Sequence, residues 1–240
     1  MMRMGALLLY TLLFAPVYSF RAVILPGFGN DLIDYKNFSS ALGKRGIQCT
    51  TVPIKRYEWL NIAKGVLSSK FWKSECIPDE LFKFYYDKVD TTVREAVSSS
   101  ETNDPIVLVC HSAGGWLARG LIGDNKWYGS STPSSELIAG IVTLGSPHFP
   151  PVLGSDMTRG ALRHVNDNYP GAFLSEIAYV TVAGSVIKGN PGNPRRIVSA
   201  LCSRLLLTWS LYCRCCQGYT REDRGRLVLY AQWIKVSSNR

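Results

Sequence analysis

The chain of 240 residues is long enough for one domain with a sizeable core and too short for two complete ones. Hydrophobic residues make up 46% of it and charged residues only 19%, which excludes a largely disordered protein. The formal charge of +9 does not indicate a nucleic-acid partner, because residues 195–240 carry nine basic and two acidic side chains, whereas residues 1–194 carry 18 and 16.

The first residues have the pattern of a targeting segment. Met1-Met2-Arg3 precedes an apolar run from Gly5 to Phe14, and Val17 and Ser19 suit a signal-peptidase site. We therefore expect residues 1–19 to be a secretory signal, with a plastid-type targeting segment, a short membrane anchor or an extra buried strand as alternatives. The run is short for a membrane span. The expected location is the secretory pathway or a plastid.

Short β-branched runs alternate with helical patterns over residues 20–190, which we expect to form one domain. The predicted strands are 22–26, 48–54, 105–110, 137–144 and 178–183. The predicted helices are 33–44, 79–98, a helix after Ser112, and 156–168. This alternation predicts an α/β fold with a mostly parallel, doubly wound sheet.

The first predicted strand leads directly into Pro26-Gly27-Phe28-Gly29-Asn30. Such a turn can direct backbone N–H groups at a substrate oxygen, and Phe28 is our candidate for one donor of an oxyanion hole. The alternative is a glycine-rich turn that only reverses the chain. A phosphate cradle is not indicated, since neither a Walker lysine nor a Gly-x-Gly-x-x-Gly spacing follows.

The run Cys110-His111-Ser112-Ala113-Gly114-Gly115 is typical of a nucleophile elbow. An apolar strand, a tight turn and a helix start follow one another here, which makes Ser112 the candidate nucleophile and the N–H of Ala113 the second oxyanion donor. Cys110 takes the position of a usual glycine, and we expect it to be tolerated because it is small. The alternative is a chance Ser-x-Gly at a helix start.

Three motifs in this order resemble lipase-like α/β-hydrolases: the Leu25–Asn30 loop, the Val109–Arg119 elbow and the segment Thr143–Pro150. The resemblance covers about residues 21–188 and is similar to the branch that includes bacterial triacylglycerol lipases and GPI inositol-deacylase-like proteins, with plastid members among them. It implies an α/β-hydrolase fold and carboxylic ester hydrolysis through an acyl-enzyme on Ser112. No cofactor and no metal are implied.

A catalytic triad requires an acid and then a histidine after the nucleophile. No Asp or Glu occurs between Gly184 and Glu222, and no histidine follows His164. His148, after the fourth predicted strand, is the best candidate base, ahead of His111 in the elbow and His164 in a predicted surface helix. Its alternative role is to shape the Ser146-Pro147-His148 turn.

Residues 191–240 differ from the family in charge and cysteine content. We expect an alternatively spliced or mispredicted segment here, which leaves the fold C-terminally incomplete; the alternative is a genuine, divergent C-terminus. Residues 226–236 alternate well enough for one strand. The cluster Cys213-Arg214-Cys215-Cys216 lacks zinc-site spacing, and the odd cysteine count assigns no disulfide.

The expected function is therefore a lipase-like serine ester hydrolase acting on a lipid or another acyl ester. Four aromatic residues are candidates for an acyl pocket, with the core as their alternative: Trp72, Tyr85, Trp116 and Phe149. The rival hypothesis is a noncatalytic protein of the same fold that binds a lipid or a partner. The basic tail adds a possible peripheral membrane contact.

Overall fold

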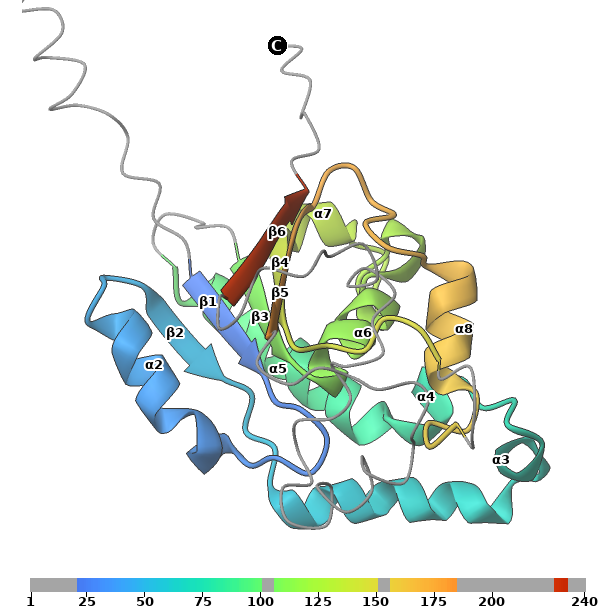
Figure 1. Ribbon diagram of the computed structural model, residues 1–240. Helices are drawn as coiled ribbons and strands as arrows, with labels where there is room; N and C mark the ends of the chain where they lie inside the picture. The colour runs from blue at the N-terminus through green and yellow to red at the C-terminus, as the bar shows by residue number, and fades with distance from the viewer. Residues whose placement is uncertain (1–20, 101–105, 151–155, 185–226, 233–240) are drawn as a thin grey trace, which may run out of the picture.

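The computed structural model describes residues 21–100, 106–150, 156–184 and 227–232 (Figure 1). Its centre is a six-stranded sheet in the order β2-β1-β3-β4-β5-β6. The strands are β1 (Arg21–Leu25), β2 (Gln48–Thr51), β3 (Ile106–His111), β4 (Ile138–Leu144), β5 (Ala178–Gly184) and β6 (Leu227–Gln232). Strands β1 to β5 are parallel and β6 is antiparallel to β5. The predicted mostly parallel sheet is confirmed.

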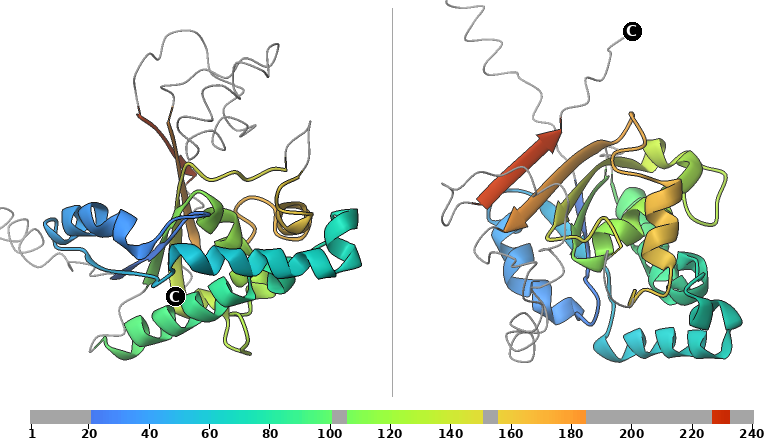
Figure 2. Two further views of the ribbon diagram at one scale, coloured as in Figure 1. Left: turned by 90° about the horizontal axis from the view of Figure 1, so that it is seen from below. Right: turned by 45° about the vertical axis from the view of Figure 1, so that its right-hand side comes forward.

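Helices cover both faces of the sheet, as a doubly wound fold requires (Figure 2). They are η1 (Leu32–Tyr35), α2 (Lys36–Gly43), η2 (Arg56–Leu67), α3 (Ser69–Lys73), α4 (Pro78–Leu81), α5 (Lys83–Ser98), α6 (Ala113–Leu121), η3 (Gly123–Asn125), α7 (Ser134–Leu137) and α8 (Ala161–Asn168). Helix α2 lies on one face, and α5, α6 and α8 lie on the other.

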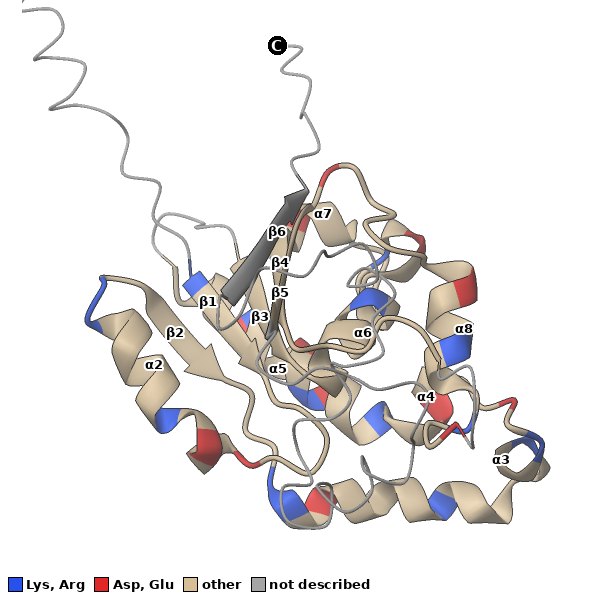
Figure 3. Ribbon diagram, viewed as in Figure 1, with Lys and Arg blue, Asp and Glu red and all other residues tan. Residues whose placement is uncertain are grey.

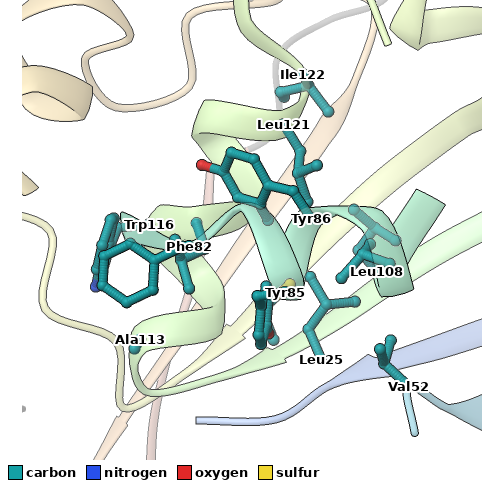
Figure 4. Packing of buried hydrophobic residues seen from close by; sticks show 14 of the residues in the cluster. Leu25, Val52, Phe82, Tyr85, Tyr86, Leu108, Ala113, Trp116, Leu121 and Ile122 are labelled. Carbon is teal, nitrogen blue, oxygen red and sulfur yellow. The ribbon is translucent and has the colours of Figure 1, made fainter. Parts of the chain in front are cut away.

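Strand β1 shows why the sheet is buried on both sides. Ala22 and Ile24 face the α2 side with Tyr35, whereas Val23 and Leu25 belong to the larger core beneath α5 and α6 (Figure 4). All four side chains are at most 2% exposed. A strand covered on both faces is apolar at every position, which is why these short runs lack alternation.

Two predicted helices differ from the structure. The predicted helix 79–98 is two helices, because the backbone of Phe82 leaves the helical region at φ −116° and ψ 18°. The predicted helix 156–168 begins only at Ala161. Before it, the Asp156 carboxylate accepts hydrogen bonds from the backbone N–H groups of Thr158 and Gly160, which fixes a turn.

Several expectations lie outside the described residues. These are the targeting segment 1–19 and most of the tail 191–240, including its four cysteines. Within the tail, β6 confirms a strand inside the predicted range 226–236. None of the helices in the described ranges has the length and apolar content needed to span a bilayer.

Candidate active site

Ser112 occupies the turn between β3 and α6, at the carboxyl end of a strand flanked by β1 and β4. Its backbone has φ 49° and ψ −119°, a left-handed conformation that a residue with a side chain rarely adopts. The N–H of Ser112 donates to the Leu144 carbonyl at 2.9 Å, and its own carbonyl accepts from Gly115 at 3.1 Å. The sharp turn is therefore fixed from β4 on one side and from α6 on the other.

Glycines permit this turn because other chain segments approach it closely. A Cβ on Gly114 would lie 2.8 Å from the Leu25 carbonyl oxygen, and one on Gly115 would collide with the Ser146 side chain. The first turn of α6 thus packs directly between the ends of β1 and β4.

Cys110, the departure from the usual elbow, is completely buried in the core beneath α6. Burial raises the pKa of its thiol well above the ordinary value, so the thiol stays protonated at neutral pH. The side chain fills space in the core and takes no part in the surface chemistry of the turn.

The loop Pro26–Asn30 lies against the elbow. A Cβ on Gly27 would be 2.9 Å from Ser112 Cβ, and the Asn30 N–H donates to the Gly27 carbonyl at 3.0 Å. Within the described residues the Phe28 N–H donates no hydrogen bond. Ala113 is the first residue of α6, so its N–H has no partner inside the helix. Neither N–H group therefore has a hydrogen-bond partner among the described residues.

Tyr35 holds this loop to the elbow, a role the sequence did not indicate. Its hydroxyl accepts from the Gly27 N–H at 2.9 Å and lies 2.8 Å from His111 Nδ1. Burial raises the pKa of Tyr35 and lowers that of His111, so both groups are neutral at pH 7. The hydrogen bond between the Tyr35 hydroxyl and His111 Nδ1 therefore joins two neutral groups, and it engages this ring nitrogen with Tyr35.

His148 lies beyond the end of β4, with Nε2 3.4 Å from Thr143 Oγ1. Burial, and next the positive charge of Arg119, lower its pKa from 6.5 to about 4. Arg119 on α6 is 2% exposed and donates to the His148 carbonyl at 3.1 Å and to the Tyr169 carbonyl at 3.0 Å. The elbow helix thus holds the His148 loop in place.

The described residues do not contain a complete triad. No described carboxylate is hydrogen-bonded or ion-paired to His148, and no described histidine is hydrogen-bonded to Ser112. His164 lies on α8, where its carbonyl and ring are contacted by Asn168. The roles predicted for Ser112, His148, Phe28 and Ala113 stay predictions.

The prediction of an acyl pocket is wrong for two of its four residues. Tyr85 and Trp116 are at most 1% exposed and belong to the core, where Trp116 packs edge-on against Phe82 (Figure 4). Trp72 and Phe149 are 65% and 39% exposed. A hollow of about 280 Å³ does open beside the elbow, lined in part by Asn30, Tyr35 and His111.

No set of three or more His, Cys, Asp or Glu side chains in the described ranges could hold a metal ion.

Comparison with known proteins gives a family match that begins after the first third of the domain. Residues 75–187 match the model of the PGAP1-like alpha/beta domain family. No curated protein matches the chain.

The solved structures that are similar to this chain include three proteins. Tomato methylketone synthase I, complexed with 2-tridecanone, shares 16% identity over 73% of this chain and 54% of its own, with a TM-score of 0.33. A metagenomic carboxyl esterase shares 15% over 68% and 49%, with a TM-score of 0.38. An acetylxylan esterase shares 13% over 80% and 96%, with a TM-score of 0.37. The chain spans about half the length of the first two.

Proposed function

Since the chain has an α/β-hydrolase fold and its residues 75–187 match the PGAP1-like alpha/beta domain family, we propose that it is a serine ester hydrolase. The substrate class is a lipid or another acyl ester, and Ser112 is the nucleophile. The family match includes the elbow and the His148 loop, two of the three motifs from which the GPI inositol-deacylase-like resemblance was drawn.

The backbone of Ser112 carries the proposal. A serine held at φ 49° costs about 1–3 kcal/mol, and a strained residue of this kind is most often found where function requires it. The strain places the side chain at the tip of the turn, half-buried and without a hydrogen-bond partner among the described residues. A purely structural turn at this position would be better served by glycine.

In the proposed reaction, Ser112 Oγ attacks the ester carbonyl carbon. The hydroxyl proton passes to the base, for which His148 is the candidate, and the carbonyl oxygen becomes an oxyanion beside the Phe28 and Ala113 N–H groups. The carbon–oxygen bond to the alcohol then breaks and the alcohol leaves with the proton. Water attacks the acyl-enzyme in the same way, releasing the acid and restoring Ser112.

We expect His148 to be a weak base in this reaction. With a pKa near 4 it is neutral at pH 7 and can accept a proton, but general bases work best when their pKa lies near the working pH. Because no carboxylate of the described residues is paired with His148, we expect slow hydrolysis, measurable with an activated ester.

The test is hydrolysis of p-nitrophenyl esters of increasing chain length by the full chain. Ser112→Ala removes the nucleophile and should abolish turnover above the uncatalysed rate, whereas Ser40→Ala on the exposed face of α2 should leave the rate within twofold. Equal rates in the wild type and in folded Ser112→Ala would contradict the proposal.

A second candidate is a noncatalytic protein of this fold that binds a lipid or a partner. The observation that favours it is the lack of any histidine–carboxylate pair beside Ser112 in the described part of the chain. Turnover that depends on Ser112 would exclude it.

A further inference from the structure

The described residues expose eleven large apolar side chains, and the two most exposed of them lie on one helical segment. Five of the eleven lie on η2 and α3, and together with three lysines of the same segment they form what we call the η2–α3 surface. Its members are Tyr57, Leu60, Val66, Leu67 and Trp72, with Lys55, Lys64 and Lys73. Leu60 is 74% exposed and Leu67 is 92% exposed.

Helix η2 is apolar on both sides. Trp59 on its inner side is 6% exposed and packs at a tilt against Tyr85, and Gly65 packs against Leu81 and Phe71. The outer side should be polar if the helix served only to cover the domain. Folding therefore accounts for the inner apolar residues and not for the outer ones, which indicates an interaction surface.

The η2–α3 surface carries an excess of positive charge that suits an anionic partner. Residues 55–73 contain five basic side chains and one acidic one. Arg56 and Lys70 are paired with Asp34 and Glu80, whereas the lysines of the surface form no ion pair among the described residues. In Figure 3, η2 and α3 along the lower edge of the molecule are mostly tan, with several blue patches and one red patch near the start of η2.

We propose that the η2–α3 surface docks on an anionic lipid bilayer. Apolar side chains enter the interface while lysines contact the headgroups, and an indole at the rim favours the same depth. The Trp72 indole N–H donates to the Val66 carbonyl at 2.9 Å, which fixes the ring at the end of η2. Lysine is depleted in the interfaces between proteins, so the mixture of leucine and unpaired lysine favours lipid over a second protein chain.

The same segment contacts the loop beside Ser112. Trp59 Nε1 donates to the Asn30 carbonyl at 2.9 Å, and its ring lies 5.1 Å from that of Phe28, which is 49% exposed. A bilayer against the outer side of η2 would therefore adjoin the proposed oxyanion loop. The docking itself does not depend on the proposed function, because it requires no activity of Ser112.

The experiment is co-sedimentation of the full chain with vesicles of phosphatidylcholine alone and of phosphatidylcholine with phosphatidylglycerol. We expect binding to the anionic vesicles that weakens on raising salt from 0.1 M to 1 M, since the screening length falls from about 10 Å to about 3 Å. Reversing Lys55, Lys64 and Lys73 to Glu should lower the partition coefficient at least fivefold per lysine, because each basic residue near an anionic surface contributes about that factor.

Control variants test whether vesicle binding depends on the η2–α3 surface or on other exposed charges. Reversal of Lys36, Lys44 and Lys126, which are exposed elsewhere, should leave more binding than the surface variant does, and Leu60→Ser with Leu67→Ser should weaken binding at constant charge. Ser112→Ala should bind as the wild type does, so that loss of activity and loss of docking are told apart.

Three outcomes would overturn the proposal. One is binding unaffected by the lysine and leucine variants. Another is binding lost instead when Arg195, Arg196 and Arg204 are changed to Gln, which would assign the contact to the basic tail. The third is self-association of the wild type in gel filtration that the leucine variant removes without any vesicle binding, which would make the surface a contact between copies of the chain.

Discussion

Ser112 is held in its strained conformation by its neighbours. The Leu144 carbonyl accepts its N–H, and Gly27, Gly114 and Gly115 leave no room for a larger residue beside it. The turn is therefore specified by residues from three segments that are distant in the sequence. Each of these contacts can be tested by a single substitution.

Gly27→Ala would place a methyl group 2.8 Å from His111 Nδ1 and 2.9 Å from Ser112 Cβ. We expect the free energy of unfolding to fall by about 1–3 kcal/mol and ester hydrolysis to fall with it, since the loop must shift away from the nucleophile. Urea unfolding and p-nitrophenyl ester turnover measure the two effects. Gly43→Ala, at a position with no atom within 4 Å of the added Cβ, is the control and should lose neither.

The lowered pKa of His148 predicts how the free energy of unfolding depends on pH. Its pKa in the folded protein is about 4, below the ordinary 6.5, so the folded state favours the neutral ring. As the pH falls, His148 is protonated in the unfolded chain at a higher pH than in the folded protein. The stability that neutral His148 contributes is therefore complete above pH 6.5 and is lost as the pH falls towards 4. The loss amounts to roughly 3 kcal/mol.

This contribution is measured by urea unfolding at pH 7 and pH 4 for the wild type and His148→Gln. The variant cannot titrate here, so its stability should fall less between the two pH values. An identical fall in both proteins would show that His148 is not held neutral.

At the scale of elements, α5 fixes the loop that follows β1. The Tyr85 hydroxyl on α5 donates to the Pro26 carbonyl at 2.8 Å, and both residues are buried. This hydrogen bond joins the larger core to the proposed oxyanion loop, across 59 residues of sequence.

Tyr85→Phe keeps the ring in the core and leaves the Pro26 carbonyl without this partner. We expect a loss of about 1–2 kcal/mol in unfolding free energy and a lower rate of ester hydrolysis. Tyr57→Phe, at a position 65% exposed, should change stability by less than about 0.5 kcal/mol. A Tyr85→Phe protein as stable and active as the wild type would show that the loop is held by other contacts.

The strands were predictable because buried parallel strands leave a simple signal, a short apolar run bounded by Pro, Gly or polar residues. Even the error at β2 has a local cause: the predicted strand 48–54 ends at Thr51 because Pro53 has no N–H for the ladder. The segment 56–73 was not predicted as helix. Its apolar residues point both inward and outward, as Trp59 and Leu60 do, so no single helical stripe is visible.

At the scale of the molecule, the site is assembled where the carboxyl ends of β1, β3 and β4 meet. The sequence predicted the residue at each strand end, since each follows an apolar run directly. It could not predict that Tyr35 joins Gly27 to His111, or that Arg119 holds the His148 carbonyl, because these contacts span 8 to 76 residues and depend on the fold. The predicted elbow was thus easier to find than the groups that support it.

The measurement that tests the central claim most directly is reaction of the full chain with a fluorophosphonate, followed by mass spectrometry of the peptides. An activated Ser112 predicts one adduct per chain, located on the peptide that contains Ser112 and absent in Ser112→Ala. A folded wild-type chain that gains no adduct, or gains it on another serine, would contradict the assignment of Ser112 as the nucleophile.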